Sequence, residues 1–194
     1  MTEAIYPLLR DGGPLLAAFN GVQALLKAAF SEKQFKYHMV QPRMSAQRWA
    51  DIARVAPAIG VSLASWNKTA VSGSAFYADV TVPVFLISSQ NSPNDLLLGT
   101  KQSPGIAGMM AVAVFALDGR RIEGVGTISV KAASNLEAAN WVNDRTAIST
   151  LQVVVKNVGF NADAIRAQLL ELENSDGTWD FAPSVTQTDG ANEA

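Results

Sequence analysis

Apolar and polar positions follow two different periods along the chain, and the change of period separates predicted helices from predicted strands. Over residues 13–34 the apolar positions recur every three or four residues, which predicts an amphipathic helix. A second, short helix is predicted from Ser45 to about Val55, with Pro57 ending it. Beyond Pro57 the period changes to two, which indicates strands.

The first alternating segment, "APAIGVSLASW" at residues 56–66, predicts a strand with Ile59, Val61 and Leu63 on one buried face. The polar segment "NKTAVSGS" that follows is expected to be a loop.

The clearest strand pattern is "AFYADVTVPVFLIS" at residues 75–88. One face is apolar at every second position, and Tyr77, Asp79 and Thr81 lie on the other. Pro83 interrupts this pattern, and because proline has no backbone N–H, it favours an edge strand or a bulge. The linker that follows, residues 90–102, is expected to hold a helical turn.

Two strands are predicted in the second half of the chain, "TISVKAA" at residues 127–133 and "DRTAISTLQVVVKNV" at residues 144–158. A capped helix, "NADAIRAQLLELEN", begins at Asn161 and closes the domain. Strand pairs with helices before, between and after them predict an α+β fold with a mostly antiparallel mixed sheet packed with helices. We expect one domain over residues 1–182 and a disordered polar tail over residues 183–194.

The segment "SPGIAGMMAVAVFALDG", residues 103–119, is apolar at nearly every position between Pro104 and Asp118. It is shorter than the roughly 20 apolar residues that cross a bilayer, so it predicts a helix of a globular protein. Ser103 is expected to cap this helix, Pro104 to occupy its first position, and Asp118 with Gly119 to end it. An all-apolar helix is expected to be buried on all sides, against the sheet of its own chain, a neighbouring subunit or both.

Composition narrows the class of protein. Of the 194 residues, 48% are hydrophobic and only 16% are charged, with a formal net charge of −2. This balance argues against a sequence-specific nucleic-acid-binding protein, whose affinity would require clustered Lys and Arg. The chain has no cysteine, which excludes disulfides and thiolate-bound metal sites. Its N-terminal sequence lacks the features of a secretory signal, so we expect synthesis in a cytoplasm.

No arrangement of residues supports catalysis or a cofactor. His38 is the only histidine and is expected to be a partly exposed side chain, because no nucleophile motif accompanies it. The Asp residues are scattered and match no metal-binding loop, so neither a metal nor a cofactor is expected. We expect that the protein is not an enzyme.

Four residues are candidates for an interface. In "GRRIEGVG", Arg120 and Arg121 stand between glycines, but the order of strand and helix differs from that of a phosphate-binding loop, which favours a solvated connection. Contact of the two arginines with a charged partner is the alternative. Trp179 and Phe181 follow the last predicted helix. They either fold back onto the domain or anchor a neighbouring molecule, as aromatic residues often do at interfaces.

Over about residues 15–160, the order of elements resembles the Mu-like bacteriophage tail-terminator (tail completion) proteins. The resemblance rests on the segments "APAIGVSLASW", "FYADVTVPVFLIS", "PGIAGMMAVAVFALDG", "TISVKAA" and "TLQVVVKNVGF". Within the apolar helix, the matching positions are Gly105, Ile106, Met109, Met110, Val114, Leu117 and Gly119. The short helix around Trp49 and the C-terminal aromatic residues depart from the family pattern.

The resemblance implies a structural virion protein that closes into a ring, with six copies, on the last ring of the tail tube. Such a ring ends tube growth and presents a surface for head–tail joining, with the tube protein, a head–tail connector or neck protein and a tail sheath as partners and genome DNA passing through the ring. Its implied location is the head-proximal end of the phage tail. Two alternatives stay open: another tail, tube or head-completion component, and a monomeric ligand-binding α+β domain.

Overall fold

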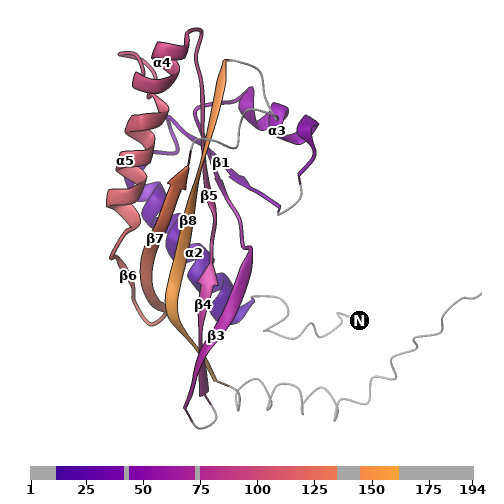
Figure 1. The fold of residues 1–194 in the computed structure, drawn as a ribbon, viewed down its shortest axis with the longest axis vertical. Coiled ribbons are helices and arrows are strands. Elements are labelled where there is room, and N and C mark those ends of the chain that lie inside the picture. Colours follow the sequence, from indigo (N-terminus) through magenta and orange to yellow (C-terminus); the bar gives the residue numbers. More distant parts are fainter. Residues whose placement is uncertain (1–11, 42–43, 73–74, 135–144, 162–194) are drawn as a thin grey trace, which may run out of the picture.

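The computed structural model describes residues 12–41, 44–72, 75–134 and 145–161. These residues form an elongated α+β domain, which confirms the predicted fold class (Figure 1). Three sequence predictions lie outside the described residues: the helix that follows Asn161, the aromatic residues Trp179 and Phe181, and the C-terminal tail.

Eight strands form one mixed, mostly antiparallel sheet centred on the long strand β8 (Thr146–Asn161). One edge of β8 pairs first with β5 and then with β4, and its other edge pairs with β7, which also pairs with β6. The sheet continues from β5 to β2 and then to β1, which is parallel to β2, and from β4 to β3. The other strands are β1 (Lys36–Met39), β2 (Ala58–Val61), β3 (Ser65–Ser72), β4 (Ala75–Thr81), β5 (Val84–Ser89), β6 (Arg121–Ile122) and β7 (Gly126–Ser134).

The long strand predicted at residues 75–88 is present as two strands, β4 and β5, separated by Val82 and Pro83. The backbone N–H of Val82 donates to Val153 on one side, and the carbonyl of Pro83 accepts from Ser62 on the other. Pro83 therefore lies in the break between β4 and β5, with hydrogen-bonded strands on both sides. The predicted alternative of an edge strand is excluded.

The predicted loop at residues 67–74 is wrong over most of its length, because Ser65–Ser72 forms strand β3. Its backbone pairs antiparallel with β4, with a bulge between Lys68 and Ala70. This pairing depends on backbone groups that the polar side chains of the segment do not reveal. Leu63 is also more exposed than predicted, at 38%, because it lies in the break between β2 and β3.

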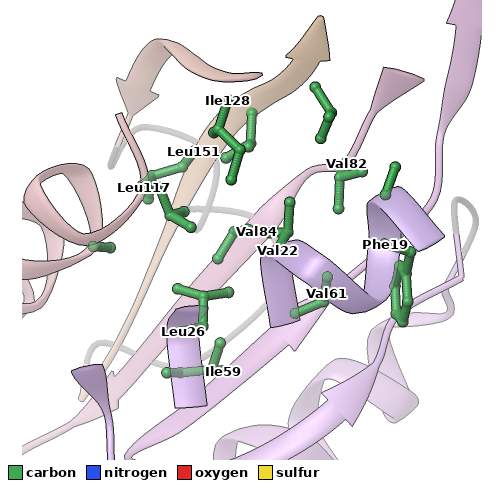
Figure 2. Close-up of a cluster of buried hydrophobic side chains, with 14 of the residues drawn as sticks. Phe19, Val22, Leu26, Ile59, Val61, Val82, Val84, Leu117, Ile128 and Leu151 are labelled. Carbon is green, nitrogen blue, oxygen red and sulfur yellow. The ribbon is translucent and has the colours of Figure 1, made fainter. Parts of the chain in front are cut away.

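The main core lies on one face of the sheet, under α2 (Gly13–Ala29) and α5 (Ile106–Leu117). Figure 2 shows Phe19, Val22 and Leu26 of α2 above strand residues that include Ile59 and Val61. The alternating apolar residues Ala78, Val80, Val82, Val84 and Leu86 are all fully buried, as their period predicted.

Helix α2 ends at Ala29, five residues before the predicted end. Phe30 is extended and buried, and its ring meets that of Phe35 edge to face, with 5.0 Å between centroids. The hydroxyl of Tyr37 donates to the carbonyl oxygen of Phe30 at 2.8 Å. The chain therefore turns towards β1 at this point, and the carbonyl of the capping residue Phe30 has a partner.

Helix α3 (Ala46–Ala53) covers one end of the opposite sheet face, where a smaller core includes Ala58, Ile87 and Ile148. The predicted start at Ser45 is confirmed, since its side chain accepts a hydrogen bond from the backbone N–H of Arg48. Because both faces are covered here, all four residues of β2 are buried, rather than the single face that was predicted.

A short helix, α4 (Pro93–Leu98), confirms the helical turn expected in the linker to α5. The N-terminal residues of α5 differ from the prediction: the cap is Gly105, without a side-chain hydrogen bond, and the helix begins at Ile106. Ser103 instead belongs to a tight turn in which its carbonyl accepts from the N–H of Thr100. The predicted C-terminal stop is confirmed, because α5 ends at Leu117 and Gly119 adopts a φ of +70°.

Candidate interaction surfaces

One side of α5 is buried in the main core. Ile106, Met109, Ala113 and Leu117 are at most 1% exposed and face β5, β7 and β8. These residues are separated by three or four positions and therefore form a single stripe along the helix.

The opposite side of α5 is apolar and uncovered in the described part of the chain. At about 3.6 residues per turn, Gly108, Ala111, Val112 and Phe115 project to the side diametrically opposite the buried stripe. We call these four residues the outer stripe. Phe115 is 82% exposed and Val112 44% exposed, and Gly108 and Ala111 are also exposed. The prediction that this helix is buried on all sides is therefore wrong for the single chain.

Helix α4 extends the apolar surface beyond the start of α5. The two helices contact each other, and Leu97 and Leu98 of α4 are 49% and 68% exposed. The close approach of the two helix ends depends on Gly105, where a Cβ would lie 2.4 Å from the backbone of Leu98.

The predicted interface residues Arg120 and Arg121 follow α5 directly and lead into the β6–β7 hairpin. Both side chains are exposed, and among the described residues neither guanidinium lies within ion-pair distance of a carboxylate. The hairpin is firmly placed, because the carbonyl of Arg120 accepts from Ile128 and the side chain of Ile122 fills the space beside Gly21 of α2. The two arginine side chains therefore project from a well-ordered hairpin.

Charged side chains from β4, β7, β8 and the end of α5 influence one another. The side chain of Lys156, as a hydrogen-bond partner and as a like charge, holds the pKa of Lys131 below its ordinary value. Asp79 and Asp118 act in the opposite direction. Asp79 and Asp118 also accept hydrogen bonds from the backbone, so these acidic groups help to hold the strands in place.

His38 lies on β1 and is half-buried, in agreement with the partly exposed side chain that was predicted. Its Nε2 atom is buried and has no hydrogen-bond partner among the described residues, and burial lowers the pKa of the imidazole. His38 is therefore favoured in its neutral form.

An aromatic cluster at the far end of the sheet is a feature that the sequence patterns missed. Phe76 of β4 and Phe160 of β8 stack with 4.8 Å between ring centroids, and Trp66 of β3 lies 5.9 Å from each. The Nζ of Lys68 lies 5.3 Å from the centroid of the Phe76 ring. These rings come from three separate segments, and only the pairing of β3 with β4 brings Trp66 to the other two.

A surface cleft of about 360 Å³ lies between the α4–α5 turn and the start of β1. Lys101 is the single charged residue among its lining residues, which are otherwise Gln34, Phe35, Pro57, Thr100, Gln102, Ser103 and Pro104. The described residues include no group of three or more His, Asp or Glu residues placed to hold a metal ion. In the same part of the chain, no helix is both long enough and apolar enough to span a bilayer.

Among known proteins, no protein-family model and no curated protein sequence matches the chain.

Proposed function

We propose that the chain is a structural subunit that associates with copies of itself into a closed ring, and that this ring caps a phage tail tube. The observation that carries the proposal is the outer stripe of α5. A helix that is apolar on two opposite sides, one of them covered by its own sheet, is suited to contact a second surface.

The chemistry of the outer stripe fits a contact between proteins. Burying a phenylalanine that was exposed contributes about 1.5–3 kcal/mol, and Val112 beside it adds further apolar area. Gly108 and Ala111 carry little or no side chain, so a neighbouring backbone can approach closely between the larger residues. An exposed aromatic residue in such a setting is a typical anchor of an interface.

A ring requires that the contact be head-to-tail, so that the outer stripe of one subunit meets a different surface of the next. Rotational closure then fixes the number of copies without leaving the stripe exposed. The edge strands β1 and β3 offer further surface for such contacts, because in the described structure each has one edge without a neighbouring strand. The number six and the place at the head-proximal end of the tail come from the resemblance to tail-terminator proteins.

In this proposal Arg120 and Arg121 make polar contacts at the rim or lumen of the ring. Trp179 and Phe181, outside the described residues, anchor a neighbouring subunit. The tube protein and the head–tail connector bind the two faces of the ring, and no residue has a catalytic role.

The proposal is tested by locating the protein in purified virions with gold-labelled antibodies and electron microscopy. We expect label at the head-proximal end of the tail only. Label along the whole tail, or tubes formed by the purified protein, would assign it to the tube instead. Absence of the protein from virions would remove the structural role altogether.

A further inference from the structure

The aromatic cluster lies on a three-stranded arm made of β3, β4 and residues 154–161 of β8, at the lower end of the sheet in Figure 1. Register places Trp66 and Val71 on the same face as Ala78 and Val80, which are fully buried beneath the main core. Trp66 is nevertheless 47% exposed and Val71 64% exposed. The core face of the sheet therefore continues onto the arm as an apolar surface that the described residues leave open.

The chain itself supplies a segment at this position. Phe160 pairs with Phe76 and Asn161 pairs with Ala75, so the last described residue of β8 lies beside the aromatic cluster. In the sequence of residues 162–174, Ile165, Leu169 and Leu172 are spaced by four and three positions, which predicts a helix with one apolar stripe.

We propose that residues 162–174 dock as a helix on the aromatic face of the arm of the same chain, with Ile165, Leu169 and Leu172 covering Trp66, Val71 and Phe76. This inference is independent of the proposed ring. The cluster would then be closed by the residues that follow it directly in the sequence.

Length and charge both fit this occupant. Thirteen helical residues extend over about 20 Å, and the eight residues of β3 over about 26 Å, so the helix can follow the arm without overhanging it. The segment contains Asp163, Glu171 and Glu173 against one arginine, and the exposed Lys68 lies at the cluster. An acidic helix is therefore complementary to Lys68, the charge that the described residues place at the cluster.

Disulfide trapping tests the contact cleanly, because the natural chain has no cysteine. Val71→Cys is combined in turn with Ile165→Cys, Leu169→Cys and Leu172→Cys in the full chain and oxidised. We expect an intramolecular disulfide in at least one pair, since the Cα atoms must come within about 7 Å. The matched control replaces Val71→Cys by Tyr77→Cys, because Tyr77 lies on the opposite face of the same arm, and no control pair should close.

Failure of every Val71 pair to close would overturn the proposal. Disulfides between two chains would also overturn it, since they would show that the segment docks on another copy.

Hydrogen exchange of the β3 amides gives a second measurement without new disulfides. We expect Leu169→Asp to speed exchange over Ser65–Ser72 about tenfold, whereas Ala167→Asp, which adds the same charge on the opposite side of the predicted helix, should leave it unchanged. Unchanged exchange in Leu169→Asp would contradict the docking. If deletion of residues 1–11 speeds the exchange and Leu169→Asp does not, the N-terminal segment covers this surface instead.

Discussion

Helices α2 and α5 lie against the same face of the sheet and contact each other, yet their outer sides differ in chemistry. The outer side of α2 carries Asn20 and Lys27 together with exposed alanines, and Lys27 forms an ion pair of 2.7 Å with Glu32. The outer side of α5 instead carries the large apolar side chains of Val112 and Phe115. Helix α2 therefore has an outer side that is suited to solvent, whereas α5 presents a second apolar surface.

This difference shows that burial in the core does not explain the composition of α5. Ile106, Met109, Ala113 and Leu117 suffice to pack the helix on the sheet, as Phe19, Val22 and Leu26 do for α2. Met110 and Val114 add further contacts with the core, whereas the outer stripe contributes little to the stability of a single chain. Its contribution is expected in contacts with another molecule.

The largest expected effect separates the two sides of α5. Leu117→Ala removes a fully buried side chain and should lower the free energy of unfolding by about 2–5 kcal/mol. Phe115→Ala should change it by no more than about 0.5 kcal/mol, because that ring is exposed in the single chain. Urea unfolding of the unassembled protein measures both values. A similar loss for both variants would place Phe115 in the subunit core.

A smaller effect separates two glycines of the α5 segment. A Cβ at Gly105 would lie 2.2 Å from the backbone nitrogen of Gly99, so Gly105→Ala should cost about 1–3 kcal/mol through displacement of α4. A Cβ at Gly108 would meet nothing within 4 Å, and Gly108→Ala should stabilise the single chain by about 0.5–1 kcal/mol. Thermal unfolding of the two variants is the test. Destabilisation by Gly108→Ala would mean that the outer stripe is covered within the chain.

A further expected effect appears only at high pH and concerns the end of α2. Burial, followed by the charge of Glu32, raises the pKa of Tyr37 to about 12. The pKa of an unfolded tyrosine is about 10, so the folded protein holds this proton more tightly. The resulting contribution to stability is complete below pH 10 and is lost as the pH rises towards 12. Unfolding measured between pH 9 and 12 should show this loss in the natural chain and not in Tyr37→Phe; an identical pH dependence in both would contradict it.

Periodicity predicted the elements whose side chains alternate clearly, including the apolar face from Ala78 to Leu86 and the helix capped by Ser45. It failed for β3, because that strand is held by backbone pairing with β4 and its side chains are mostly exposed. It also failed for the outer side of α5. The sequence of this helix has no polar residues, so no alternation of apolar and polar positions shows which side is buried. Arg120 and Arg121 are exposed, as expected, although Arg121 belongs to β6, and their part in an interface stays a prediction. The aromatic cluster could not be predicted, because it depends on the register of three strands.

The central claim is that the outer stripe of α5 joins copies of this chain in a closed ring. Native mass spectrometry of the full chain, with tail tubes present if the ring requires a template, measures this most directly. The account predicts that the natural chain gives one fixed number of copies, that Phe115→Asp gives single subunits with unchanged folding, and that Asn20→Asp on the outer side of α2 assembles normally. Assembly of Phe115→Asp to the same number of copies as the natural chain would contradict it.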